Sequence, residues 1–169
     1  HGHCHHRIID VMTKQAQTLC VTSRAFYSDK LAPFMEKLCH VSGMDMGIPM
    51  NSGAEAVETA IKAARMWGYK VKGIAKNKAK IIVAKNNFHG RTTTIISFSS
   101  ETNYKNNFGP LTPGFITIPY GDAKALEAAI DEDTCAFLIE PIQGEGGIIK
   151  HRYTTNINGT DHRSQIRDL

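Results

Sequence analysis

Cysteine is scarce in this sequence, and no apolar run is long. The chain has four cysteines among its 169 residues, Cys4, Cys20, Cys39 and Cys135. No two of them have metal-site or redox spacing, so we exclude a disulfide-stapled scaffold and expect reduced, intracellular thiols. No apolar stretch approaches the ~18–20 residues of a transmembrane helix. Length and composition fit one soluble domain, or part of a larger one.

Charge of one sign is also limited, with a net charge of +4. The largest concentration of positive charge is a run of six lysines: Lys70, Lys72, Lys76, Lys78, Lys80 and Lys85. Lysines in this density are typical of a surface that binds nucleic-acid phosphates, but only Tyr69 offers an aromatic ring for base stacking. We interpret the run as a solvated loop before a strand and expect no nucleic-acid partner.

The first six residues, HGHCHH, place four histidines around Cys4. Such a tract is typical of metal binding. Imidazoles this close in sequence need ligands from elsewhere to enclose one ion, and none are evident. We interpret the tract as a turn before a helix and expect no metal.

Hydrophobic periodicity predicts an α/β fold. Apolar residues at three- and four-residue steps predict helices over residues 7–19, 31–39, 53–67 and 122–130. Short apolar runs predict strands over residues 81–84, 115–118 and 136–139. Strands that alternate with helices indicate a mostly parallel sheet flanked by helices. We expect Gly68 to end the third helix and Asp122 to cap the fourth.

Two segments have the local chemistry of a ligand site. Ser52 and Glu55 have the spacing of a capping box, and Gly53 allows an anion to approach the free N–H groups of the first helical turn. An ordinary capped helix and a phosphate cradle are both consistent with this pattern. The segment 86–92 follows a strand, where open α/β sheets bind their ligands.

Four segments, MNSGAEA, NNFHGRT, FGPLTPGF and IEPIQGEGG, occur in this order and resemble the class III aminotransferases. That family depends on pyridoxal 5′-phosphate and has the type I fold. Residues 21–27 and 65–74 resemble its ornithine-type members, and the acetylornithine and 4-aminobutyrate types are alternatives. The resemblance covers about residues 1–149. Residues 150–169 diverge from it and are polar, with apolar residues scattered without a period, so we expect a disordered tail. It also implies L-ornithine and 2-oxoglutarate as substrates, a homodimer without membrane partners, and a mitochondrial or cytoplasmic location.

The resemblance implies specific roles on the cofactor side of the site. Ser52, Gly53 and Ala54 would hold the cofactor phosphate through backbone amides and a hydroxyl. Phe88 would stack on the pyridine ring, although a phenylalanine of the hydrophobic core is the ordinary alternative.

On the substrate side, the resemblance assigns three residues. Arg91 would bind the substrate carboxylate as a bidentate fork. Tyr27 would lie near the distal amino group of ornithine. Glu145 would pair with a later arginine when ornithine binds and release it for 2-oxoglutarate.

The resemblance also implies catalytic residues that this sequence lacks. The family has a Schiff-base lysine and a carboxylate beside the pyridine nitrogen, both after the IEPIQGEGG segment. No lysine here matches the first, so we expect the chain to be inactive by itself. A non-catalytic truncated isoform that binds full-length subunits is the alternative from another functional class. The sequence begins without methionine or a recognisable leader, so we expect it to start inside a longer protein.

Overall fold

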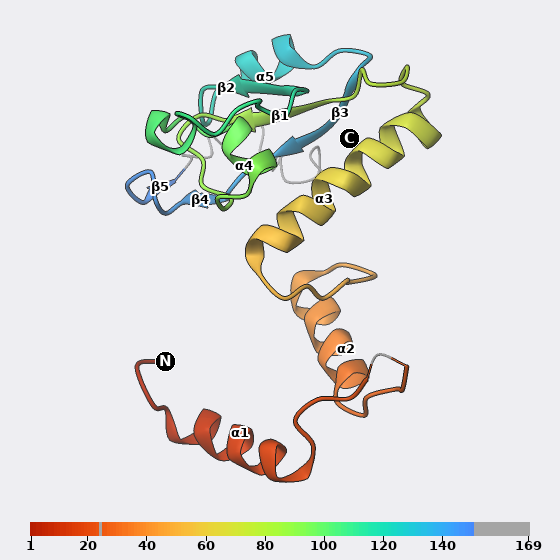
Figure 1. The fold of residues 1–169 in the computed structure, drawn as a ribbon, viewed down its shortest axis with the longest axis vertical. Coiled ribbons are helices and arrows are strands. Elements are labelled where there is room, and N and C mark those ends of the chain that lie inside the picture. Colours follow the sequence, from red (N-terminus) through yellow and green to blue (C-terminus); the bar gives the residue numbers. More distant parts are fainter. Residues whose placement is uncertain (24, 151–169) are drawn as a thin grey trace, which may run out of the picture. The chain divides into compact units, whose positions relative to one another are not determined.

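The chain forms two compact units, His1–Pro49 and Met50–Leu169 (Figure 1). The computed structural model describes residues 1–23 and 25–150. The disordered tail expected from residue 150 therefore lies, apart from its first residue, outside the described residues. No helix among those described is long and apolar enough to cross a membrane.

The first unit contains the two predicted helices, α1 (His6–Thr18) and α2 (Leu31–Ser42). Helix α2 continues three residues beyond the predicted end. It ends at Gly43, which adopts a left-handed conformation with φ 69° and donates its N–H to the carbonyl of Cys39. A glycine in this position is a common helix terminator because it has no Cβ to clash.

The apolar stripe of α2 is exposed, although apolar residues at helical spacing are typical of a helix face that packs on a core. Leu31, Phe34 and Leu38 are exposed, and the side chain of Phe34 is 56% exposed. Every residue of α1 and α2 is at least partly exposed. The first unit therefore presents apolar side chains to its surroundings.

The second unit contains a parallel three-stranded sheet. Strand β1 (Lys80–Ala84) lies between β2 (Phe115–Ile118) and β3 (Thr134–Leu138). Parallel pairing aligns Ile82 with Ile116 on one side and with Phe137 on the other. All three strands were predicted, and β1 is apolar and buried from its second residue to its last because it is the central strand of the sheet.

Helices cover the sheet, which confirms the predicted α/β class. Helix α3 (Gly53–Trp67) and the short α4 (Thr93–Ser97) pack on one face, and α5 (Ala123–Ala129) lies on the other side, against β2 (Figure 1). The core lies between α3, α4 and the sheet and is formed by Ile61, Ile81, Val83, Ile95 and Phe98.

The end of α3 differs from the prediction. Gly68 is helical, and the chain continues through a π-helical turn, η1 (Gly68–Lys72), to Gly73, which is left-handed with φ 80°. A Cβ on Gly68 would lie 2.8 Å from the Cβ of Cys135 on β3. Gly68 therefore allows helix and sheet to approach closely, and Gly73 is the terminator.

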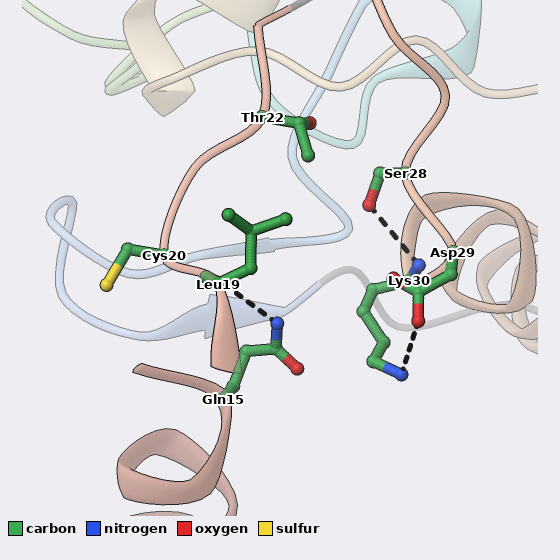
Figure 2. Close-up of a pocket in the computed structure, with 7 residues that line it drawn as sticks. All are labelled: Gln15, Leu19, Cys20, Thr22, Ser28, Asp29 and Lys30. Carbon is green, nitrogen blue, oxygen red and sulfur yellow. Dashed lines mark hydrogen bonds and ion pairs between the residues drawn. The ribbon is translucent and has the colours of Figure 1, made fainter. Parts of the chain in front are cut away.

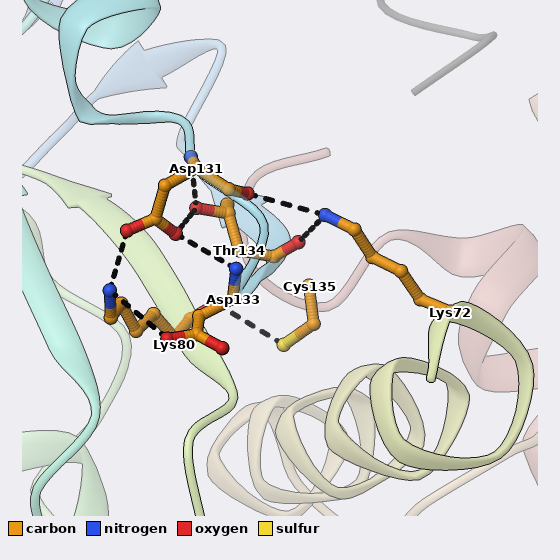
Figure 3. A network of polar contacts seen from close by, with 6 residues as sticks. All are labelled: Lys72, Lys80, Asp131, Asp133, Thr134 and Cys135. Atoms are coloured by element: carbon orange, nitrogen blue, oxygen red, sulfur yellow. Dashed lines mark hydrogen bonds and ion pairs between the residues drawn. The ribbon is translucent and has the colours of Figure 1, made fainter. Parts of the chain in front are cut away.

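Two of the six lysines pair within the fold instead of lining a solvated loop. Lys72 Nζ donates to the carbonyls of Asp131 and Thr134, at 3.4 and 2.6 Å. Lys80 forms ion pairs with Asp131 and Asp133 (Figure 3). These contacts join η1 and β1 to the start of β3, at the edge of the sheet opposite to the loops that follow the strands.

Candidate functional site

The N-terminus of α3 is capped as predicted. The Ser52 hydroxyl accepts a hydrogen bond from the Glu55 N–H at 3.2 Å, and the Glu55 carboxylate accepts the N–H of Asn51 at 2.9 Å. This reciprocal pair differs from the standard capping box only in that the carboxylate reaches one residue further back. Because the hydroxyl accepts from Glu55, its own proton stays available to a ligand.

Two backbone donors at this helix end are free. The N–H groups of Gly53 and Ala54 have no hydrogen-bond partner in the described part of the chain. A Cβ on Gly53 would meet no atom within 4 Å, so the space on the side-chain side of Gly53 is open. Free N–H groups at the positive end of a helix dipole bind anions. The site therefore fits a phosphate group.

The loop after β1 packs against this helix end. Gly90 has φ 123°, and a Cβ there would lie 3.0 Å from the Cβ of Ala54. The Thr92 hydroxyl donates to the carboxylate of Glu58 in the second turn of α3. Position 90 therefore requires glycine, both because of its positive φ and because of its close approach to Ala54. The contact brings Phe88 and Arg91 to the helix end that carries Ser52.

Phe88 is half-buried and lies outside the main core cluster. Its N–H donates to the carboxylate of Glu140 at 3.1 Å. Its ring contacts the ring of Tyr104 edge-on, with centroids 6.3 Å apart. The ring is therefore part of the loop surface at this site.

Arg91 lies beside the same two rings. Its guanidinium carbon is 5.3 Å from the ring centroid of Phe88 and 5.3 Å from that of Tyr104. The hydrogen bond with the Tyr104 hydroxyl raises the pKa of Arg91, and the charge of Glu145 contributes less. Arg91 and Glu145, both predicted substrate residues, are therefore near enough to interact.

The loop that carries Glu145 packs on the loop after β1. A Cβ on Gly146 would lie 3.0 Å from the carbonyl oxygen of Asn86. Gln143 is buried and donates to the Lys85 carbonyl at 2.8 Å. It is the last residue of β4 (Ile142–Gln143), which forms a small hairpin with β5 (Ile149–Lys150). The carboxyl ends of β1 and β3 thus bring the predicted loops together.

Glu140 was given no role from the sequence, yet it links several parts of the site. Its carboxylate accepts the Phe88 N–H, and its charge acts on His89. Its carbonyl accepts a hydrogen bond from the Tyr120 hydroxyl at 3.1 Å. The signal that could have found it is its position at the end of a parallel strand, next to the other loops.

His89 is the titratable group of this region whose pKa is lowered. Burial lowers the pKa below its ordinary 6.5, and the nearby charge of Glu140 partly opposes that shift. Its Nε2 is buried and has no hydrogen-bond partner among the described residues. The imidazole is therefore expected to be neutral at pH 7.

Tyr27, predicted to contact the substrate, belongs to the first unit, and its side chain is fully exposed. Its role stays a prediction. That unit has an open pocket of about 180 Å³, shown in Figure 2. Ligand sites are usually ~300 Å³ or more, and the Lys30 and Asp29 side chains that line this pocket pair with each other at 2.9 Å. No cluster that could hold a metal ion exists within residues 1–23 and 25–150.

The fold is that of the pyridoxal-phosphate-dependent aminotransferases. The family model for class-III aminotransferases matches residues 1–157. The chain belongs to the class-III aminotransferase family. The match continues past residue 149, so the domain boundary placed there stays a prediction.

Relatives by sequence include ornithine aminotransferases from bacteria. The chain is 58% identical to that of Halalkalibacterium halodurans over 147 residues, which cover 87% of this chain and 37% of the relative. It is 50% identical to that of Macrococcus caseolyticus over 168 residues, 99% of this chain and 41% of the relative. The chain thus spans well under half the length of these relatives.

Solved structures agree in fold. A crystal structure of the ornithine aminotransferase from Toxoplasma gondii ME49 matches with a TM-score of 0.86 and 46% identity, over 89% of this chain and 36% of that one. A second structure of the T. gondii enzyme has partial occupancy of pyridoxal phosphate at its active site. The acetylornithine aminotransferase of Elizabethkingia anophelis matches with a TM-score of 0.70 and 53% identity, over 89% of this chain and 36% of that one.

Proposed function

We propose that this chain is part of a pyridoxal-phosphate-dependent ornithine aminotransferase, which transfers the δ-amino group of L-ornithine to 2-oxoglutarate. The products are glutamate 5-semialdehyde and glutamate. One observation carries the proposal: the open N-terminus of α3 lies against the loop of Phe88 and Arg91, with Gly90 packed on Ala54. The names of the relatives support the choice of ornithine.

The residues present fit the cofactor phosphate. The free N–H groups of Gly53 and Ala54 and the hydroxyl proton of Ser52 point to a dianion as their ligand. Phe88 would flank the pyridine ring, which fits its half-buried position outside the core cluster and its contact with Arg91. When bound, pyridoxal 5′-phosphate supplies an electron sink for proton loss from the carbon that bears the amino group.

The substrate side is formed by charges of both signs. Arg91 would bind a carboxylate through two parallel N–H groups. Glu145 would pair with an arginine from a later part of the whole protein when ornithine binds, and would release that arginine to bind the anionic 2-oxoglutarate. We infer a homodimer for the whole protein, because the resemblance to enzymes of this fold implies a dimer with its active sites at the interface.

We further propose that these 169 residues alone catalyse no transamination, because none of their lysines matches the one that anchors the cofactor in the family. A second candidate function is acetylornithine aminotransferase, which the 53% identity to the E. anophelis enzyme favours. The two candidates differ in the α-amino group of the substrate, which is free in ornithine and acetylated in the other.

The cofactor site is tested with Gly53→Pro. Proline is tolerated at the first helical position, and Ser52 already has the extended backbone that precedes a proline (φ −147°, ψ 163°). The change removes one N–H donor and leaves α3 intact. We expect the affinity for pyridoxal 5′-phosphate, measured by fluorescence quenching, to fall about tenfold, as for a lost charged hydrogen bond.

The matched control is Ala123→Pro, which makes the same change at the first position of α5, away from the site. It should leave the affinity unchanged. Pyridoxal without phosphate should bind wild type and Gly53→Pro alike. Equal affinity of Gly53→Pro and wild type for pyridoxal 5′-phosphate would contradict the cradle.

The substrate is tested by protection of Arg91 from phenylglyoxal in the pyridoxal-phosphate-loaded chain. We expect L-ornithine to protect at lower concentration than N-acetyl-L-ornithine. The reverse order would favour the acetylornithine enzyme, and protection by neither would contradict both assignments.

A further inference from the structure

Tyr104 contacts two residues of the proposed site, although nothing in its sequence context assigns it a role. It ends the short 3-10 helix η2 (Thr102–Tyr104), which Glu101 caps by accepting the Asn103 N–H at 3.2 Å. The Tyr104 N–H donates to the Glu101 carbonyl at 3.2 Å. The backbone of Tyr104 is thus fixed locally, and its half-buried ring is directed at Phe88 and Arg91.

The guanidinium of Arg91 contacts both rings at the same distance, 5.3 Å to each centroid. These distances are within the range of attractive cation–π contacts. An exposed arginine otherwise loses much rotamer freedom when it binds a ligand, at a cost in free energy. Two rings that restrict the guanidinium beforehand reduce that cost.

The contact with Tyr104 uses little of the hydrogen-bonding capacity of Arg91. No ion pair of the described residues involves Arg91, and its hydrogen bond to the Tyr104 hydroxyl is long, at 3.5 Å. A guanidinium has five N–H donors in a planar fork. Stacking therefore orients the group while most of its donors stay free for a ligand.

We propose that Tyr104 is a positioning residue: its ring holds the Arg91 guanidinium in place and leaves the donor fork free to bind a substrate carboxylate. The identity of that carboxylate rests on the proposed function, but the ordering of Arg91 by Tyr104 does not. The ring is the required part, and the hydroxyl contributes little.

The test compares Tyr104→Leu, which removes the ring, with Tyr104→Phe, which keeps it. The readout is the rate of phenylglyoxal modification of Arg91 in the full chain without ligand, followed by peptide mapping. We expect Tyr104→Leu to raise the rate about fivefold, the size of a lost exposed cation–π contact. Tyr104→Phe should stay close to wild type.

Arg65 provides an internal reference, because its guanidinium lies 5.1 Å from the Phe115 ring and donates to the Pro113 carbonyl, away from Tyr104. A constant Arg65 rate shows that the fold is intact. An unchanged Arg91 rate in Tyr104→Leu with a constant Arg65 rate would overturn the proposal.

If the Arg65 rate also rises, the variant fold is disturbed, and the contact between Arg91 and Tyr104 is then tested by NMR in the wild-type protein. Nuclear Overhauser contacts between the Arg91 side chain and the Tyr104 ring support the proposal, and their absence overturns it.

A second measurement separates this inference from the proposed function. In wild type, 2-oxoglutarate should protect Arg91 from phenylglyoxal, and Tyr104→Leu should raise the half-protecting concentration about fivefold. If Tyr104 orders Arg91 but 2-oxoglutarate gives no protection, the positioning role stands and the proposed function fails. If 2-oxoglutarate protects wild type and Tyr104→Leu equally, the positioning role fails and the proposed function stands.

Discussion

Glu140 connects the end of β3 to the loop that follows β1. Its carboxylate accepts the backbone N–H of Phe88 at 3.1 Å, and the Tyr120 hydroxyl holds the carbonyls of Glu140 and Pro141. A charged acceptor makes a stronger hydrogen bond than a neutral one. The backbone position of Phe88, and with it the direction of its ring, therefore depends on a side chain 52 residues later.

Replacement of Glu140 should show this dependence at a single amide. We expect Glu140→Ala to raise hydrogen exchange at the Phe88 N–H about tenfold, because the amide loses its acceptor. Glu140→Gln keeps an acceptor oxygen of the same reach and should retain most of the protection. Residue-resolved exchange by NMR makes the measurement. Equal exchange at Phe88 in wild type and Glu140→Ala would refute the link.

His89 predicts a dependence of stability on pH. Its folded-state pKa is lowered by burial, so the native state binds fewer protons than the unfolded state as the pH falls through 6.5, the ordinary value. The contribution of neutral His89 to the free energy of unfolding is fully present above that pH, and it is lost as the pH falls towards the folded-state pKa of His89. Urea unfolding from about pH 7.5 to about pH 5.5 should show a smaller loss of stability in His89→Gln than in wild type. An identical slope in both proteins would show that His89 does not cause it.

At the scale of elements, the contact between α3 and β3 depends on the missing side chain of Gly68. A Cβ there would lie 2.8 Å from the Cβ of Cys135 and 3.0 Å from Cδ1 of Ile74. The Cys135 Cβ is bonded directly to the backbone of β3 and cannot move aside alone. Any larger residue at position 68 must separate the helix from the sheet.

Gly68→Ala should therefore destabilise the chain by about 1–3 kcal/mol, the usual cost of overpacking, despite the better helix propensity of alanine. Gly53→Ala is the matched control, since a Cβ there meets nothing within 4 Å in the same helix. It should be neutral or stabilising. Chemical denaturation gives the free energy of unfolding of both variants, and equal values would contradict the packing role of Gly68.

Elements with local signals could be predicted from the sequence. Ser52 and Asp122 cap α3 and α5 as expected, because a capping side chain bonds to backbone only three residues away. The strands consist mostly of apolar residues and were found for that reason. Gly68 was predicted to end the helix because a glycine near a helix end usually terminates it. Here glycine is needed instead because the helix passes close to Cys135, which is distant in the sequence.

Elements whose stability comes from distant contacts were missed. Helix α4 is five residues long, and its buried Ile95 and Ile96 hold it against the core. The 3-10 helix that carries Tyr104 has no apolar period to reveal it. For the site, the rule that open α/β sheets bind ligands at strand ends pointed to the segment 86–92, and the family resemblance supplied Phe88, Arg91 and Glu145. The contacts of Tyr104 and Glu140 could not be predicted, since their partners come together only in the folded chain, although Glu140 had the signal of a strand end.

For the whole molecule, the distribution of apolar surface is uneven. Residues of α1 and α2 are all at least partly exposed, although both helices carry apolar side chains at helical spacing. Burial of apolar area is worth roughly 25 cal/mol per Å², so such surfaces favour association. We therefore expect the first unit to be where the chain associates with itself, in agreement with the proposed homodimer.

Three valines of nearly equal exposure allow a matched test. Val11 on α1 and Val41 on α2 are 70% and 73% exposed, and Val71 in the second unit is 71% exposed. Sedimentation velocity over a range of chain concentrations should show self-association in wild type. Replacement of Val11 and Val41 by glutamate should weaken it, because a charge in an apolar contact must be desolvated. Val71→Glu adds the same charge at the same exposure and should leave association unchanged. Equal weakening by all three would mean that net charge, and not the apolar surface of the first unit, controls association.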